Sequence, residues 1–310
     1  MSPRCAPMGR ADVAADISNS CEDEPARDPT ARAVTAVKKG KSKNLLLDGS
    51  TLTALPESIG KLRKLQSLRL DNNQLTTLPH AIGRLTVLRV LSGQNNRLAS
   101  LPVEIGQLGS LQMLDVSGNA LASLPDSFCG LRSLQTCCLH DNQLSILPHE
   151  MGRLGPTLRV LTLLKNRLTY LPATFEELVN LEQLSLSFNA IWISAVEQLS
   201  KLSKLQKLWL ASNRLTAFPI AWCHGFDALT FLDLSRNHIA ALPPDICDGF
   251  ASLRQLNLSD NQLTVLTPAI CALALHTIEV QGNPLTRPPL KVCTCTCTCT
   301  HVHMHMHMHM

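Results

Sequence analysis

Two side chains of this sequence have the types and spacing of a catalytic pair. Cys138 and His140 are separated by one residue in "TCCLHD", and a cysteine near a histidine base is the arrangement that nucleophilic cysteines require. Both residues lie along one predicted strand, and no third group orients the imidazole. The sequence also lacks paired carboxylates, a glycine-rich phosphate loop and a metal triad. We therefore predict no enzymatic activity.

The C-terminal segment "CTCTCTCTHVHMHMHMHM" alternates thiols, imidazoles and thioethers, which are the ligands of soft metal ions. Its ligands are separated by a single residue, unlike the ligands of structural zinc sites. A repeated hexanucleotide translated in two frames would produce Cys-Thr and then His-Met, which accounts for the pattern without a metal. We predict a low-complexity tail over residues 291–310, no bound metal and no cofactor.

Most of the chain consists of a unit that recurs every 22 to 24 residues with the pattern L-x-x-L-x-L-x-x-N-x-L-x-x-L-P. The units begin at Ser42, Leu65, Leu88, Leu111, Leu134, Leu158, Leu181, Leu205, Leu229, Leu253 and Leu275. The first unit has Ser50 at the ninth position, where the others have asparagine. These asparagines are Asn73, Asn96, Asn119, Asn142, Asn166, Asn189, Asn213, Asn237, Asn261 and Asn283.

The pattern within a unit predicts a short strand, a tight turn and a return segment. In "LQSLRL", Leu68 and Leu70 alternate with Arg69, which is the period of a strand with one buried face. Asparagine suits the following turn because its side chain can pair backbone groups that the turn leaves unpaired. One unit cannot bury its leucines alone, so the units must stack. We predict an α/β solenoid, horseshoe-shaped, with a concave parallel β-sheet and short helices or turns on the convex side.

The stretch "LTALPESIGKLRKLQSLRLDNNQLTTLPHAIGRL" resembles the leucine-rich repeat family, and in particular its intracellular "LPxxIGxL" class. It is similar to Ras-binding repeat scaffolds, to cell-polarity proteins of the Scribble and Erbin type, and to plant intracellular Ras-group-related repeat proteins. The resemblance covers residues 42–290. It implies a protein-binding scaffold in small-GTPase or kinase signalling, with a small GTPase, a phosphatase or a kinase as candidate partners.

The ends of the array have a different composition. Residues 1–27 have no apolar period and are predicted to be a disordered leader. Residues 28–41 carry Asp28 and Pro29 at one end and Gly40 near the other, which predicts a short helix that caps the first repeat. We therefore divide the chain into the leader, this capping helix, an array of about eleven units over 42–290, and the tail.

Composition limits the other classes of partner. The formal net charge is +4 over 310 residues, which is too small and too evenly spread to predict nucleic-acid binding. No stretch approaches the ~20 apolar residues that span a bilayer. The cysteines do not cluster at either end of the array, so we expect a reducing, cytoplasmic environment. The sequence does not predict the oligomeric state.

A group of apolar residues occurs where the repeat pattern expects polar ones. Trp209 occupies the outward strand position between Ser185 and Asp233 of the neighbouring units, and we expect its side chain to project from the concave face. A contiguous exposed apolar group with nearby arginines is typical of a binding site. The predicted partner-binding residues are Leu164, Phe188, Trp209, Arg214, Phe231, Asp233 and Arg236.

The unit that begins at Leu181 departs from the pattern because Ser194 and Ala195 replace the Leu-Pro pair. Without the proline, "SAVEQLSKLSK" predicts a longer helix with Val196, Leu199 and Leu202 on its inner face.

Four cysteines occupy the nineteenth position, where other units have glycine: Cys129, Cys223, Cys247 and Cys271. We interpret them as small packing residues, with redox sensing as the functional alternative.

The function that these patterns favour is a non-enzymatic adaptor that binds a protein partner on its concave face. The alternative is a fragment of an innate-immune or ligand-sensing receptor or effector. That alternative would need attached nucleotide-binding or kinase modules, for which we find no room in the sequence.

Overall fold

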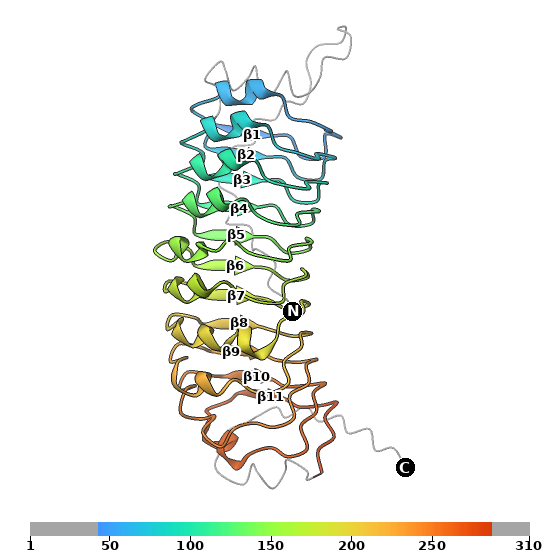
Figure 1. The fold of residues 1–310 in the computed structure, drawn as a ribbon, viewed down its shortest axis with the longest axis vertical. Helices are drawn as coiled ribbons and strands as arrows, with labels where there is room; N and C mark the ends of the chain where they lie inside the picture. The colour runs from blue at the N-terminus through green and yellow to red at the C-terminus, as the bar shows by residue number, and fades with distance from the viewer. Residues whose placement is uncertain (1–42, 287–310) are drawn as a thin grey trace.

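The structure is a computed structural model that describes residues 43–286, and these residues form one elongated stack of repeats (Figure 1). An 11-stranded sheet runs the length of the stack, and every pair of neighbouring strands is parallel and consecutive in the chain. The strands are β1 (Asn44–Leu46), β2 (Ser67–Arg69), β3 (Val90–Ser92), β4 (Met113–Asp115), β5 (Thr136–Cys138), β6 (Val160–Thr162), β7 (Gln183–Ser185), β8 (Lys207–Trp209), β9 (Phe231–Asp233), β10 (Gln255–Asn257) and β11 (Thr277–Glu279). The predicted solenoid with a parallel sheet is confirmed.

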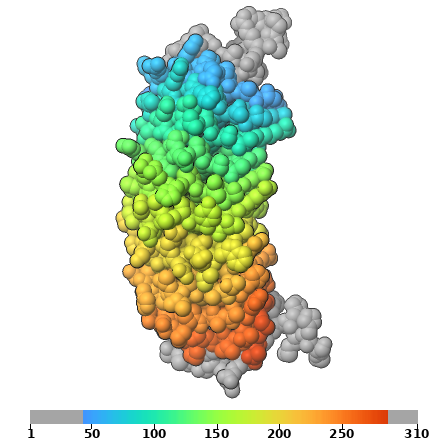
Figure 2. Space-filling view, in the orientation of Figure 1, coloured from blue at the N-terminus to red at the C-terminus, as the bar shows by residue number. Residues whose placement is uncertain are grey.

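In the described part of the chain, most return segments on the convex side are 3-10 helices, and the unit that begins at Leu229 returns through turns over residues 244–249. Most of these helices follow a proline and end before a leucine. Each is therefore limited to one or two turns. The helices are η1 (Glu57–Lys61), η2 (His80–Arg84), η3 (Val103–Gln107), η4 (Asp126–Gly130), η5 (Met151–Leu154), η6 (Ala173–Glu177), η7 (Ile193–Ala195), η8 (Glu197–Lys201), η9 (Ile220–His224) and η10 (Pro268–Ala272). In the space-filling view, the colours run in chain order from one end of a single elongated body to the other (Figure 2).

The core lies between the sheet and these helices, and it consists mainly of leucine. Leu68 and Leu70 are fully buried while Arg69 between them is exposed, as the strand period predicts. From the convex side, Ile59 and Leu62 close the same layer. Each unit buries its leucines against the next one, so the units are stable only as a stack.

Each asparagine of the ninth position ties its own turn to the preceding unit. Asn142 shows the pattern: its Nδ2 donates to the carbonyl of Leu139 in its own unit and to that of Val116 in the unit before, both at 3.0 Å. Its Oδ1 accepts the backbone N–H of Leu121, also at 3.0 Å. The other nine asparagines repeat these contacts. The column therefore satisfies backbone groups in two units at once.

The residue just before each of these asparagines, and before Ser50 in the first unit, has a left-handed backbone. Glycine or asparagine suits this conformation, and larger side chains are strained in it. The positions are Gly49, Asn72, Asn95, Gly118, Asp141, Lys165, Phe188, Ser212, Arg236, Asp260 and Gly282.

The prediction of one longer helix after Ser194 was wrong. The segment forms two 3-10 helices, η7 and η8, with Val196 between them. The carbonyl of Val196 accepts two hydrogen bonds, one from the backbone N–H of Leu199 in η8 at 3.0 Å and one from the indole N–H of Trp222 in the next unit at 2.9 Å. The predicted inner face is confirmed, because Val196, Leu199 and Leu202 are buried.

Three parts of the predicted domain organisation lie outside the described residues. These are the leader at 1–27, the capping helix at 28–41 and the tail at 291–310.

Candidate binding site on the concave face

The sheet register places the predicted aromatic residues side by side on the concave face. Trp209 on β8 pairs with Ser185 on β7 and with Asp233 on β9, and Phe231 pairs with Lys207. The rings of Trp209 and Phe231 have centroids 5.2 Å apart and planes at 40°. The two side chains form one continuous apolar wall, which we call the aromatic wall.

Trp209 lies on the concave face as predicted, but the expectation that its side chain is exposed was wrong. Only 8% of Trp209 is exposed, because its ring lies against Phe231 and the sheet instead of standing away from it. Leu164, another predicted contact residue, is equally buried. The sequence pattern identifies which face a strand residue occupies, but it does not show how far the side chain folds over its neighbours.

Phe188 is exposed in the way the sequence predicts, and its backbone is strained. It is 43% exposed and has a φ of +56°. Its backbone N–H donates to the carbonyl of Ala211 in the next unit at 2.8 Å, which holds it in the turn. The turn of every unit has this conformation, and a bulky aromatic in it costs energy.

The two predicted arginines lie outside the aromatic wall. The guanidinium of Arg214 stacks over the ring of Trp192 at 5.5 Å from the centroid. Arg236 stands in a left-handed turn, and its Nε is 3.5 Å from Oδ2 of Asp260. The structure therefore brings together Trp209, Phe231 and Asp233 but places the arginines on the turn side of the repeats.

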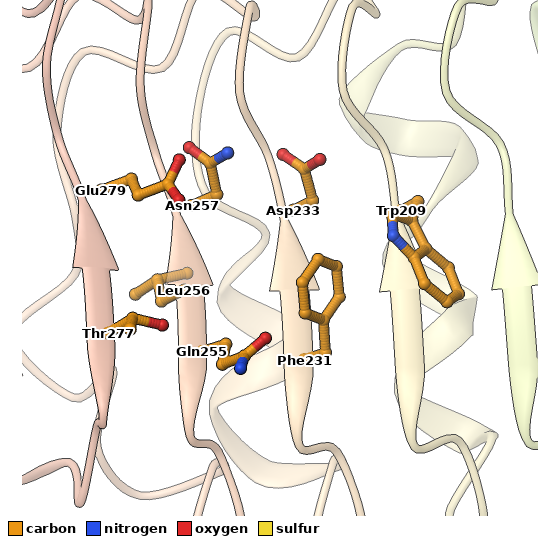
Figure 3. Close-up of a pocket in the computed structure, with 8 residues that line it drawn as sticks. All are labelled: Trp209, Phe231, Asp233, Gln255, Leu256, Asn257, Thr277 and Glu279. Carbon is orange, nitrogen blue, oxygen red and sulfur yellow. The ribbon is translucent and has the colours of Figure 1, made fainter. Parts of the chain in front are cut away.

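A hollow of about 220 Å³ opens beside the aromatic wall, over β8 to β11 (Figure 3). We call it the concave pocket. The aromatic rings bound it on one side, and shorter polar side chains of the last two strands line the rest. Its lining residues are Trp209, Phe231, Asp233, Gln255, Leu256, Asn257, Thr277 and Glu279.

The carboxylates of the pocket differ in how they are held. Oδ1 of Asp233 accepts hydrogen bonds from the backbone N–H of Ser235 at 3.0 Å and from its hydroxyl at 2.7 Å, so the side chain is fixed in one orientation. Glu279 lies two strands away in the same column, on the last strand. Within residues 43–286, neither carboxylate forms an ion pair.

Sequence reasoning missed the polar half of this pocket. Gln255, Asn257, Thr277 and Glu279 are ordinary residue types for the outward strand positions, so nothing in the pattern distinguishes them from solvated side chains. Their position beside two bulky rings makes them the lining of a hollow. The only available signal was the register of the repeats, which places them next to Phe231 and Asp233.

The surroundings of the cysteines do not favour nucleophilic catalysis or redox sensing. Cys138 is fully buried, and Nδ1 of His140 lies 3.3 Å from the hydroxyl of Thr162. Burial raises the pKa of Cys129 to about 11, with a smaller contribution from the negative charge of Glu150. A raised pKa leaves little reactive thiolate at neutral pH. In the described range, no three residues of the types His, Cys, Asp or Glu are grouped as metal ligands.

Between residues 43 and 286, no helix combines the length and the apolar character needed to cross a bilayer.

The repeat pattern and the parallel solenoid with its concave site define a solenoid repeat protein. Comparison with known protein families and solved structures identifies the family. A leucine-rich repeat region matches residues 80–225, leucine-rich repeat pairs match residues 203–263 and 232–285, and a single repeat matches residues 64–85. An LRR protein of Leptospira interrogans is 30% identical over 76% of this chain and 77% of that chain, with a TM-score of 0.49. The chain belongs to the leucine-rich repeat family, whose domains generally mediate protein–protein interaction and are typically non-enzymatic.

Other solved structures share the fold over part of their length. The structure of PEPR1–AtPEP1 is 26% identical over 74% of this chain and 37% of that chain, with a TM-score of 0.61. The Toll–Spatzle complex of Drosophila is 24% identical over 80% of this chain and 34% of that chain, with a TM-score of 0.67. Among curated proteins, none matches the sequence significantly. In total 475 solved chains match, so the likeness is too widespread to indicate one function.

Proposed function

We propose that this chain is a non-enzymatic adaptor that binds a protein partner on its concave face, around the concave pocket. The observation that carries the proposal is the pocket itself, where an aromatic wall meets polar side chains in a hollow of about 220 Å³. This volume is below the roughly 300–1,000 Å³ of small-molecule sites, so it suits one side chain of a protein better than a metabolite. A central aromatic pocket with a polar rim is typical of protein interfaces.

Phe188 supports a binding surface that extends onto the turn side of the repeats. Every other unit of the described array has a residue other than an aromatic in the left-handed turn, so replacing this phenylalanine would relieve strain and remove exposed apolar surface. A residue that costs stability and solubility in this way is explained if it contacts a partner.

The proposal also covers the class of leucine-rich repeat, the cellular compartment and the kind of partner. The "LPxxIGxL" pattern favours the intracellular class, a cytoplasmic location and a role as scaffold in signal transduction. By resemblance, the candidate partners are a small GTPase, a phosphatase or a kinase. The predicted contact residues Leu164, Arg214 and Arg236 would lie at the margin of the interface, while Trp209 and Phe231 would lie at its centre.

A ligand-sensing receptor or immune array is the second candidate, favoured by the likeness to PEPR1–AtPEP1. One feature distinguishes the two. Asn257, Leu258 and Ser259 form an Asn-x-Ser acceptor for N-glycosylation, and Asn257 lines the pocket. A secreted protein would carry a glycan there, so mapping this peptide from native cells by mass spectrometry tests the compartment.

Site-specific photocrosslinking tests the interaction itself. A photoreactive amino acid at Gln255, an exposed residue of the pocket, should crosslink the partner in cells. The same amino acid at Val103, which is 62% exposed at the start of η3 on the convex side, is the matched control. Equal crosslinking from both positions, or crosslinking from Val103 alone, would contradict a concave-face interaction.

A further inference from the structure

The concave pocket has the chemistry to recognise a basic side chain. Its aromatic wall presents the half-buried ring of Phe231 and the small exposed part of Trp209, and the opposite side presents the carboxylate of Glu279. A planar guanidinium can stack on an aromatic ring and bind a carboxylate through two parallel hydrogen bonds. Arginine is therefore the side chain whose shape and charge match both sides of this hollow.

The spacing of the carboxylates fits one cation between them. Asp233, Asn257 and Glu279 are consecutive partners in the sheet register, so the two carboxylates are two strand spacings apart, about 10 Å. The side chain of Asn257 between them is neutral and short, and its Oδ1 is held by the backbone N–H and the hydroxyl of Ser259. A cation placed above Asn257 would feel both negative charges without displacing an existing ion pair of the described residues.

The charge of the whole concave face also favours a basic side chain as the ligand. The chain has a formal net charge of +4, but the outward positions of the strands and of the turns that follow them are acidic. The strands carry two outward cations, Arg69 and Lys207. The turns add Lys165 and Arg236, which form ion pairs with Asp141 and Asp260. Five further carboxylates occupy these positions: Asp48, Asp71, Asp115, Asp233 and Glu279. A partner that complements this face is therefore basic.

Three of these carboxylates already accept hydrogen bonds within the array: Asp48, Asp71 and Asp115. Oδ1 of Asp71 accepts the hydroxyl of Ser92 at 2.6 Å, and that of Asp115 accepts the hydroxyl of Ser117 at 2.6 Å. Asp48 accepts the backbone N–H of Asp71 at 2.9 Å. Glu279 makes no such contact among the described residues and is exposed, so the carboxylate that is most available lies in the pocket.

We propose that the concave pocket binds an arginine side chain from a basic segment of the protein partner, stacked against Trp209 and Phe231 and paired with Glu279. The proposal rests on the proposed function, because it names the chemistry of the partner at the same site. It does not extend to metal ions, since a cation of that kind would leave the aromatic wall without a role.

The indole N–H of Trp209 offers a direct probe because its nitrogen faces the pocket (Figure 3). The chain has three tryptophans, so a nitrogen-15 spectrum shows three indole signals, and Trp209→Phe identifies the relevant one. Trp222 is buried and bonded to Val196, so its signal is an internal reference. Trp192, which is exposed beside Arg214, reports non-specific binding.

The probe is an acetylated alanine–glycine nonapeptide with one central arginine, titrated into the full chain. Its matched control contains citrulline, which has nearly the same shape without the charge. We expect the arginine peptide to shift the Trp209 signal saturably, with a dissociation constant at least about tenfold lower than that of the citrulline peptide. Glu279→Gln should weaken binding of the arginine peptide about fivefold. Glu197→Gln, which removes the same charge from an exposed residue of η8, should leave it unchanged.

Equal shifts with the two peptides, an unmoved Trp209 signal, or equal effects of the two glutamate variants would overturn the inference. The outcome is separable from that of the proposed function. Photocrosslinking of a partner at Gln255 together with an unmoved Trp209 signal would leave the concave-face function standing and reject the arginine site. Failure of both experiments would reject both.

Discussion

The indole of Trp209 and the ring of Phe231 pack together across β8 and β9, 5.2 Å between centroids and tilted by 40°. Neither residue belongs to the leucine core, and both stand on the face of the sheet that the helices do not cover. The pair therefore adds a small apolar layer on the outer side of the sheet. This layer stabilises two neighbouring units and at the same time forms one side of the concave pocket.

The packing of this pair predicts a stability effect at Trp209. Trp209→Ala should lower the free energy of unfolding by about 2 kcal/mol, because it removes a nearly buried aromatic and its ring partner. Trp192→Ala is the control, since that ring is 48% exposed, and its effect should stay within about 1 kcal/mol. Urea denaturation measures both. A melting curve of Trp209→Ala that matches the wild type would show that the ring is not held against Phe231.

The left-handed backbone at Phe188 predicts a substitution that stabilises. Phe188→Asn should raise the free energy of unfolding by about 0.5–1 kcal/mol, because asparagine adopts this conformation readily and occupies it in other units. Crosslinking of the partner should fall in the same variant. Val179→Asn, which also removes an exposed apolar side chain, should bring no gain, as Val179 is not in a left-handed turn. A destabilised Phe188→Asn protein would mean that the ring packs within the array.

The asparagine column predicts that substitutions at two adjacent residues differ strongly in their effect on stability. Asn142→Ala should lower the free energy of unfolding by about 1–3 kcal/mol, because backbone groups of Val116, Leu139 and Leu121 lose their partner. Gln143→Ala changes an exposed residue next to it and should have little effect. Thermal melts of the two variants provide the comparison, and similar shifts would refute a structural role for the column.

The close packing of the convex helices predicts that a single methyl group is costly. A Cβ on Gly106 would stand 2.0 Å from the carbonyl oxygen of Ser127 in the next unit, so Gly106→Ala should cost about 2 kcal/mol by forcing η3 and η4 apart. Gly109 has nothing within 4 Å of the same position, and Gly109→Ala should be neutral or slightly stabilising. Equilibrium unfolding of both alanine variants tests the difference.

The raised pKa of Cys129 predicts a loss of stability in alkali. The folded state keeps this thiol protonated up to a pKa of about 11, whereas the unfolded chain ionises near the ordinary value of about 8.5. The stability that burial of the neutral thiol contributes is therefore fully present below about pH 8.5 and is lost as the pH rises towards 11. Unfolding measured between pH 8 and 11 should show a smaller slope in Cys129→Ala. An unchanged slope would show that the thiol is not buried in solution.

The sequence by itself determined the architecture. A unit of 22 to 24 residues with leucines at alternate strand positions can be buried only by stacking, so the parallel sheet, its register and the concave column followed from spacing alone. The face occupied by Trp209 was predictable for the same reason. Local chemistry also determined the buried positions of the convex segments, as Ile59 and Leu62 show.

The tertiary structure decided how side chains lie on the faces that the repeat defines. Trp209 is nearly buried because Phe231, 22 residues later in the chain, stands beside it. The repeat pattern does not predict contacts between outward residues of different units. The segment predicted as one helix after Ser194 is divided into η7 and η8 at Val196, whose carbonyl accepts hydrogen bonds from both Leu199 of η8 and Trp222 of the next unit. The concave pocket arises in the same way, from bulky rings on two strands beside short polar side chains on the next two. Spacing along the chain determines the face of a residue, whereas the packing of neighbouring units determines its exposure.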